Sequence, residues 1–242
     1  MGKFFFKPED RIGETVTISG NAAHHMLRVL RLRAGEEVTL CDGNATDYRG
    51  VVISLSSKPE TLTFRLASPA PSKSEASYPI TLYQGLPKGD KMDWIIEKCV
   101  EAGVFRIIPV LTARTEAKLK DTSKKSERYA RIAASAASQS MRGIIPDIAP
   151  PISFAEATAE CSRGPCLVAY EQETSGTIKK ALQGLQPGPI SLWVGPEGGF
   201  EDSEVRVLVC AGATPITLGP RILRTETAGL VAISQILCIW DA

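Results

Sequence analysis

Two glycine-containing segments near the end of the chain combine residues that could bind a ligand and move a proton. The first reads LWVGPEGGF over residues 192–200, and the second reads LGPRILRTETA over residues 218–228. Each begins as an apolar run that ends at glycine, and a glycine lets the backbone approach a ligand closely. The second segment adds two arginines and a glutamate, which would be costly to bury unpaired in a core. Two such loops after two strands predict one shared ligand crevice.

The glycine spacing excludes two common nucleotide sites. There is no G-x-G-x-x-G after the first strand of this half and no Gly-Lys-Ser/Thr, so a dinucleotide-dependent oxidoreductase and a P-loop enzyme are disfavoured. A tight strand-to-helix turn is the alternative interpretation of the first segment. Asp202 or Ser203 is expected to cap the helix that follows it, and Thr225 or Thr227 the last helix.

Strands and helices alternate through the second part of the chain. We expect strands at residues 80–84, 105–110, 167–170, 190–194 and 215–218, and helices at residues 91–102, 126–141, 178–185, 203–211 and 225–240. This alternation predicts an α/β fold with a parallel sheet. Because ligands bind beyond the carboxyl ends of parallel strands, both glycine segments would lie at the ligand-binding edge.

The first part of the chain is rich in β-structure instead. Short runs of Val, Ile, Thr and Phe at residues 15–18, 37–40, 50–53 and 61–66 are separated by turn residues, with one helix capped by Asn21. Such spacing predicts a small barrel. Residues 67–79 have the proline- and serine-rich composition of a linker. We therefore predict two domains, at residues 1–72 and 73–242.

The composition is that of a soluble globular protein. Of the 242 residues 43% are hydrophobic, the net charge is +1, and no apolar run is long enough to cross a membrane. The six cysteines are scattered, and the two histidines lie far from them, so a zinc site is not expected. We expect buried or half-buried thiols in a reducing cytoplasm.

Positive charge is concentrated in two places. Residues 114–142 hold eight Lys and Arg against three acids, a net charge of +5, and residues 24–33 hold two histidines and three arginines. Lys and Arg position nucleic acids through their phosphates, so both clusters are candidate RNA contacts. A solvated loop and a solvated helix face are the alternative.

These segments resemble the ribosomal RNA small subunit methyltransferase E family of the SPOUT superfamily, over nearly the whole chain. The resemblance includes the residues 24–31 and 42–43, the helix with Lys88, Asp93 and residues 97–104, and the two glycine segments. One departure precedes Arg142, because Ser138 stands where the family usually has glutamate.

The resemblance implies a PUA-like β-barrel that helps bind RNA, followed by a SPOUT α/β domain tied into a trefoil knot. It implies that S-adenosylmethionine binds in the knot loops and that the protein is a homodimer. The substrate would be 16S rRNA of the 30S subunit, methylated on N3 of the uridine at position 1498. A non-catalytic RNA-binding assembly factor that retains the fold is the alternative function.

Uracil N3 carries a proton at neutral pH, so its methylation needs a base or a cation that favours the anion. The candidates for catalysis are Arg224, Glu226 and Arg142, with Arg224 stabilising charge on the uracil oxygens. Glu226 is a base, an orienting partner of Arg224, or merely a favourable charge at a helix start. No metal is expected.

The residues expected to bind the cofactor or RNA form two sets. The cofactor would contact Tyr170, Gly195, Glu197, Gly198, Gly199, Leu218, Gly219, Ile222, Leu223 and Thr225. The RNA would contact His25, Arg28, Arg31, Lys124, Lys125 and Arg128.

Overall fold

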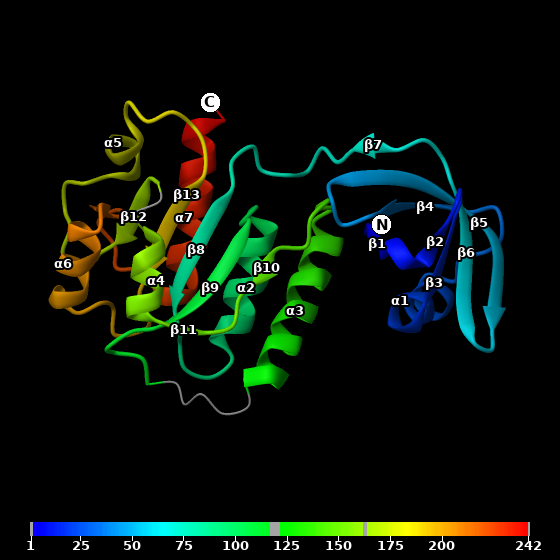
Figure 1. The fold of residues 1–242 in the computed structure, drawn as a ribbon, viewed down its shortest axis with the longest axis horizontal. Helices are drawn as coiled ribbons and strands as arrows, with labels where there is room; N and C mark the ends of the chain where they lie inside the picture. Colours follow the sequence, from blue (N-terminus) through cyan, green and yellow to red (C-terminus); the bar gives the residue numbers. More distant parts are fainter. Residues whose placement is uncertain (1, 117–121, 162–163, 242) are drawn as a thin grey trace. The chain divides into compact units, whose positions relative to one another are not determined.

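The computed structural model describes residues 2–116, 122–161 and 164–241. These residues form two compact units, each described separately below. The first unit holds residues 1–75 and 137–145, and the second holds residues 76–136 and 146–242. Figure 1 gives the order of the elements along the chain.

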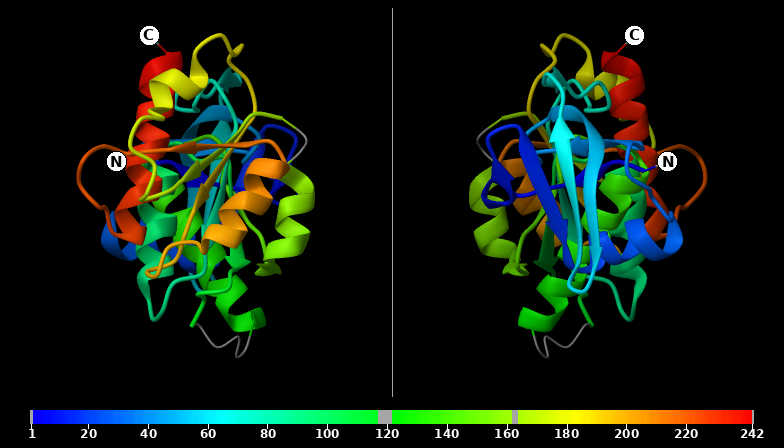
Figure 2. Two further views of the ribbon diagram at one scale, coloured as in Figure 1. Left: turned by 90° about the vertical axis from the view of Figure 1, so that its left-hand side faces the viewer. Right: turned by 90° about the vertical axis from the view of Figure 1, so that its right-hand side faces the viewer.

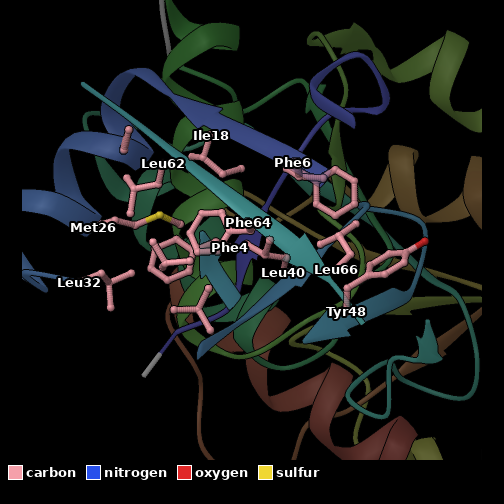
Figure 3. Packing of buried hydrophobic residues seen from close by; sticks show 14 residues of the cluster. Phe4, Phe6, Ile18, Met26, Leu32, Leu40, Tyr48, Leu62, Phe64 and Leu66 are labelled. Carbon is pink, nitrogen blue, oxygen red and sulfur yellow. The ribbon is translucent and has the colours of Figure 1, made fainter. Parts of the chain in front are cut away.

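The first unit is built on a curled sheet of seven strands in the order β1-β4-β5-β6-β3-β2, with β7 paired to β5. The strands are β1 (Phe4–Phe5), β2 (Arg11–Ile12), β3 (Thr15–Ser19), β4 (Glu37–Cys41), β5 (Thr46–Ser57), β6 (Glu60–Leu66) and β7 (Ala70–Pro71). The helical turns are η1 (Pro8–Asp10), α1 (Gly20–His24) and η2 (His25–Val29). Alternate strand residues point inward and bury Phe4, Val16, Leu40 and Phe64 in one core (Figure 3).

The second unit is an α/β fold on a parallel sheet in the order β10-β9-β8-β13-β12-β14, with β11 paired to β9. Its strands are β8 (Ile80–Gly85), β9 (Arg106–Leu111), β10 (Asp147–Ile148), β11 (Ile152–Ser153), β12 (Cys166–Ala169), β13 (Ile190–Val194) and β14 (Ala213–Ile216). Its helices are α2 (Lys91–Glu101), α4 (Phe154–Cys161), α5 (Ile178–Leu182), α6 (Asp202–Cys210) and α7 (Thr225–Trp240). Helix α3 (Thr122–Gln139) begins in this unit and ends in the first.

Helices cover both faces of this parallel sheet. Helices α4 and α6 lie on one face, and α2 and α7 pack together on the other (Figure 2). The spacing of Met92, Ile95, Ile96 and Val100 places one apolar stripe of α2 in the core. Trp193 of the central strand β13 is fully buried and stacks on Tyr83 with 4.6 Å between ring centroids. Strands covered on both faces are apolar along their length, as the sequence of β13 is.

Several local predictions were wrong. The first helix begins at Gly20 with Ser19 as N-cap, so Asn21 lies inside it, and Ala70–Pro71 of the expected linker pairs with β5. Helix α6 is capped by Glu201, whose capping box with Glu204 replaces the expected Asp202 or Ser203 cap. The N-cap of α7 is Arg224, and neither of the two expected caps, Thr225 and Thr227, holds that position.

Three further features differ from what the sequence predicted: one helix, the bounds of another, and the exposure of two cysteines. Helix α4 follows strand β11 and had no expected counterpart, and α3 begins and ends earlier than expected, at Thr122 and Gln139. Cys210 and Cys238 are exposed, whereas Cys41, Cys99 and Cys166 are buried as expected. The side chain of Cys161 lies outside the described ones, so the expectation for this thiol stays a prediction.

Candidate functional site

A cavity of about 990 Å³ lies in the second unit, at the carboxyl ends of β12, β13 and β14. Three strand-end loops form its walls: residues 170–177 after β12, residues 195–199 after β13, and residues 217–224 after β14. Cavities of this size hold small ligands and cofactors. Its position agrees with the ligand-binding edge of a parallel sheet.

The loop after β13 needs its glycines because it packs on itself and on a neighbouring carboxylate. A Cβ atom on Gly195 would lie 2.9 Å from the carbonyl carbon of Gly199. Gly199 has a φ of +68°, and a Cβ there would lie 2.6 Å from Oε1 of Glu171. Residues that carry a side chain rarely adopt this left-handed backbone conformation, so the loop requires glycine at position 199.

An ion pair and hydrogen bonds hold this loop in place. Lys91 Nζ donates to Glu197 Oε1 at 2.8 Å, and the backbone N–H of Lys88 donates to the same atom at 3.1 Å. Burial alone would raise the pKa of Glu197, but these hydrogen bonds and the charge of Lys91 outweigh it and lower the pKa. Arg114 donates to the carbonyl oxygen of Gly198 at 2.6 Å. The loop is therefore tied at two successive residues.

The wall after β12 carries acidic groups and a phenol. Tyr170 donates its hydroxyl hydrogen to Asp202 Oδ1 at 2.8 Å, and this hydrogen bond raises the pKa of Tyr170. Glu173 accepts hydrogen bonds from the backbone N–H groups of Ser175 and Gly176 at 2.7 and 2.8 Å. These bonds lower the pKa of Glu173 and fix the turn that follows the strand.

The wall after β14 presents the charged groups that could take part in chemistry. The side chain of Arg224 is 85% exposed, and that of Glu226 is 18% exposed. Their nearest charged atoms, Nη1 and Oε1, are 4.0 Å apart. Glu226 Oε2 is buried and has no hydrogen-bond partner among the described residues. A buried oxygen without a partner is uncommon in proteins, and the residue itself lines the cavity, so Glu226 is a candidate functional group.

All ten residues expected to contact the cofactor line this cavity, and so do Arg224 and Glu226. Their individual roles stay predictions. Thr225, one of these ten residues, is largely buried. It is only 7% exposed, and it donates its hydroxyl hydrogen to the carbonyl oxygen of Gly195 at 2.6 Å. Its side chain therefore joins two walls.

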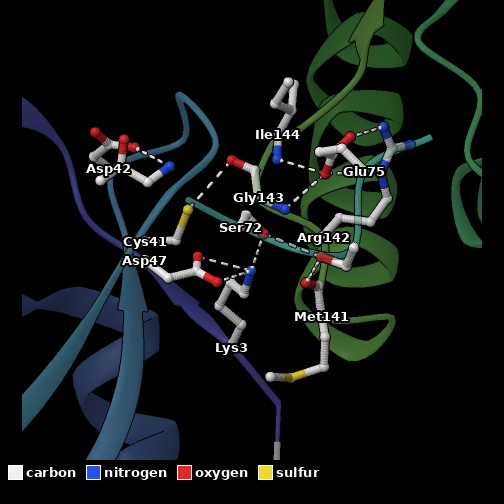
Figure 4. Close-up of polar contacts among 12 residues, drawn as sticks. Lys3, Cys41, Asp42, Asp47, Ser72, Glu75, Met141, Arg142, Gly143 and Ile144 are labelled. Carbon is white, nitrogen blue, oxygen red and sulfur yellow. Dashed lines mark hydrogen bonds and ion pairs between the residues drawn. The ribbon is translucent and has the colours of Figure 1, made fainter. Parts of the chain in front are cut away.

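Arg142, the third candidate for catalysis, belongs to the first unit. It is 2% exposed, and its Nη2 lies 2.6 Å from Oε2 of Glu75. The other carboxylate oxygen of Glu75 accepts hydrogen bonds from the backbone N–H groups of Gly143 and Ile144 (Figure 4). This environment gives Arg142 a structural partner, and its catalytic role stays a prediction.

The residues expected to contact RNA have mixed environments. In the first unit, Arg28 is paired with Glu60 at 2.7 Å, while His25 and Arg31 are exposed, and Arg31 has a φ of 56°. In the second unit, Arg128 is paired with Asp93 and lies 3.5 Å from Asp90.

The two lysines of that cluster that are expected to contact RNA differ in exposure. Lys124 is exposed and Lys125 half-buried. Lys118 and Lys120 lie outside the described residues. RNA contact by either basic cluster stays a prediction.

Sequence reasoning missed part of the cavity lining. Lys91, Thr177 and Thr217 line the cavity but belong to no motif that stood out. Glu173 could have been found, because a Glu-x-Ser-Gly turn follows directly after the strand at 166–169. Within the described ranges, no group of three or more His, Cys, Asp and Glu side chains could hold a metal ion. In the same ranges no helix is long and apolar enough to cross a membrane.

Comparison with known proteins identifies the class of protein to which this fold and cavity belong. Residues 74–237 match the family model of an RNA methyltransferase domain, and residues 18–64 match that of an RNA methyltransferase PUA domain. The protein is thus an RNA methyltransferase by family, with a PUA domain in the first unit.

Named relatives narrow this class. The ribosomal RNA small subunit methyltransferase E of Synechocystis is 35% identical over 97% of this chain and 77% of its own length, and that of Bacillus subtilis is 36% identical over 92% and 89%. The crystal structure of the enzyme of the same name from Neisseria gonorrhoeae, bound to S-adenosylmethionine, has a TM-score of 0.87 and 32% identity and covers 99% of this chain and 98% of its own. The chain belongs to the ribosomal RNA small subunit methyltransferase E family.

Proposed function

We propose that this protein transfers a methyl group from S-adenosylmethionine to N3 of the uridine at position 1498 of 16S rRNA. The observation that carries the proposal is the cavity at three strand ends, with an exposed arginine and a partly buried carboxylate on one wall. Relatives named as small subunit rRNA methyltransferases support the substrate class. The particular uridine and atom rest on the family resemblance.

The cavity fits a bent nucleoside with an amino-acid tail. Its volume of about 990 Å³ is at the upper end of the range for cofactor sites. Gly195 and Gly199 line this cavity, and their loop packs so closely that a Cβ at either position would collide with protein atoms. When bound, S-adenosylmethionine supplies an electrophilic methyl group on a sulfonium. The relative from Neisseria gonorrhoeae was crystallised with this molecule.

Arg224 and Glu226 are placed to handle the charge and proton of the uracil. The proton on N3 must leave before or during transfer. The guanidinium of Arg224 is exposed at the cavity wall, so it can stabilise negative charge developing on the uracil oxygens. The carboxylate of Glu226, which lines the cavity and is 18% exposed, accepts the proton, and its Oε1 lies 4.0 Å from Nη1 of Arg224.

Further features follow from membership of the family. We propose that the first unit is a PUA-like barrel that binds rRNA through His25, Arg28 and Arg31. In the second unit, Lys124, Lys125 and Arg128 contact the phosphates of the 30S subunit. The chain after β13 forms the trefoil knot that surrounds the cofactor, and the protein acts as a homodimer in the cytoplasm.

The experiment separates binding from chemistry. Titration calorimetry with S-adenosylmethionine measures binding, and transfer of a labelled methyl group to 30S subunits from a strain that lacks the family's enzyme measures activity. We expect both to succeed. Binding without transfer to such subunits would contradict the proposal, and absence of both would support a non-catalytic assembly factor.

A further inference from the structure

Gln84 is a fully buried polar residue near the end of the central strand β8. It does not line the cavity, and none of the motifs discussed above includes it. It lies beside two of the three cavity walls, because its side chain reaches both the loop after β13 and the first residue of α7. Because Gln84 does not line the cavity, it can affect the shape of the cavity only through the residues that it contacts, Gly195 and Thr225.

The amide of Gln84 joins three separate segments. Its Nε2 donates to Oγ1 of Thr225 at 2.9 Å and to the carbonyl oxygen of Gly85 at 3.0 Å, and it lies 3.4 Å from the carbonyl oxygen of Gly195. Thr225 in turn donates to Gly195 at 2.6 Å. The three residues Gln84, Thr225 and Gly195 therefore form a closed set of contacts, and we call it the wall triad.

The backbone next to Gln84 is shaped for this contact. A Cβ atom on Gly85 would lie 2.4 Å from Cδ of Pro196, so only glycine lets the end of β8 meet the loop after β13. The strands themselves are paired in register up to this point, with Gln84 opposite Val194. The close approach thus brings the side-chain amide of Gln84 next to Gly195, the first residue of the loop after β13.

Packing alone does not explain a glutamine here. Oε1 of Gln84 is buried and has no hydrogen-bond partner among the described residues. An unpartnered buried acceptor is unfavourable, and an apolar side chain of similar size would avoid that penalty. The benefit of the amide therefore lies in the bonds made by Nε2, which fix one cavity wall against another.

We propose that Gln84 is a positioning residue that sets the distance between the Gly195 loop and the start of α7, and so the shape of the cofactor cavity. This inference rests on the proposed function, because S-adenosylmethionine is taken as the ligand. Gln84 acts through Thr225 and Gly195 and does not touch the ligand. Residues that hold a site without touching its ligand can alter affinity as strongly as direct contacts do.

The test uses variants at the middle of the wall triad, where side-chain shape can be kept. Thr225→Val removes the hydroxyl and keeps the shape, whereas Thr225→Ser keeps the hydroxyl. Thr225→Val loses both hydrogen bonds of this hydroxyl, so we expect it to weaken S-adenosylmethionine binding at least about tenfold and Thr225→Ser to bind more tightly than Thr225→Val. Calorimetry on the full chain measures both.

Gln84→Leu and the double variant Gln84→Leu/Thr225→Val test whether the two residues act together. If they do, the double variant binds S-adenosylmethionine about as tightly as the weaker of the two single variants. Thr158→Val is the matched control, because its hydroxyl donates to the carbonyl oxygen of Phe154 within α4 and lies away from the cavity. It should lower thermal stability at most and leave affinity unchanged. If Gln84→Leu does not fold, Gln84→Met, which also lacks the amide and is unbranched like glutamine, takes its place in both comparisons.

Two results would overturn the inference while the proposed function stands. One is a Thr225→Val protein that binds S-adenosylmethionine as tightly as the unchanged protein, and the other is a Thr225→Ser protein as weak as Thr225→Val. An unchanged protein that gives no binding heat would instead reject the proposed function, and this inference with it.

Discussion

Arg142 and Glu75 form an ion pair that is almost wholly buried within the first unit, with 2.6 Å between Nη2 and Oε2. The side chains are 3% and 17% exposed, and Glu75 also caps two backbone N–H groups (Figure 4). Removing one partner of a buried ion pair costs about 3–5 kcal/mol. The pair therefore fixes residues 142–144 against the rest of this unit.

We predict that Glu75→Gln lowers the free energy of unfolding of the first unit by roughly 3 kcal/mol. All three tryptophans, Trp94, Trp193 and Trp240, belong to the second unit, so tryptophan fluorescence does not report on the first. Amide hydrogen exchange of residues 37–66 is the suitable measurement. Exchange as slow as in the unchanged protein would show that the pair contributes little. Methyl transfer per folded molecule then tests whether Arg142 also serves catalysis.

Gly199→Ala should be more harmful than an otherwise similar substitution at Gly184. Both glycines have positive φ, +68° and +81°, so each alanine carries backbone strain of about 1–2 kcal/mol. Only at Gly199 would the new Cβ also meet a neighbour, Glu171 Oε1 at 2.6 Å, while Gly184 has open space. We expect both variants to lose stability and only Gly199→Ala to lose affinity for S-adenosylmethionine. Equal affinity of the two variants would contradict this role of the glycine loop.

The ion pair of Glu197 with Lys91 should make stability depend on pH. The folded pKa of Glu197 lies below its ordinary value of 4.5, so the carboxylate stabilises the fold above that pH, and this contribution disappears as the pH falls through the folded pKa. Glu197→Gln removes the effect at all pH values. Denaturant unfolding should show a less stable variant at neutral pH and a smaller difference near pH 3. A difference that grows toward acid pH would mean that the sign is wrong.

Arg224→Ala should lower the rate of methyl transfer about 10²–10³-fold while S-adenosylmethionine binds nearly as before, because the lost charge acts on the uracil. Arg206→Ala is the control, since Arg206 is an exposed arginine on α6 that does not line the cavity. Its rate should equal that of the unchanged protein. If Arg224→Ala loses binding and rate to the same extent, Arg224 serves the cofactor instead.

The sequence predicted strand β13 and helix α2 well because their signals are local, whereas β14 begins and ends two residues before its expected range. The apolar run of β13 and the apolar spacing of α2 follow directly from residue periodicity, and both appear where expected. The glycines after β13 and β14 indicated a crevice at the strand ends, and one cavity lies there. These loops could be predicted because a glycine at the end of an apolar run is visible in the local sequence, without information on distant contacts.

Features that depend on distant residues could not be predicted in this way. Gln84 is a polar residue at the end of an apolar strand, and only the folded chain brings Thr225, 141 positions later, within 2.9 Å. Likewise the ion pair of Arg142 could not be predicted, because its partner Glu75 lies 67 positions away in the sequence. Segment 137–145 joins the first unit although the chain has already entered the second, which no composition change marks.

Methylation of uridine N3 is tested most directly by mass spectrometry of 16S rRNA. The protein and S-adenosylmethionine are incubated with 30S subunits from a strain that lacks the family's enzyme, and the nucleoside at position 1498 is then identified. We expect 3-methyluridine at that position, and none when Arg224→Ala replaces the unchanged protein over the same time. An unmodified uridine there, or a methyl group on a different base or on a ribose oxygen, would contradict the proposed function.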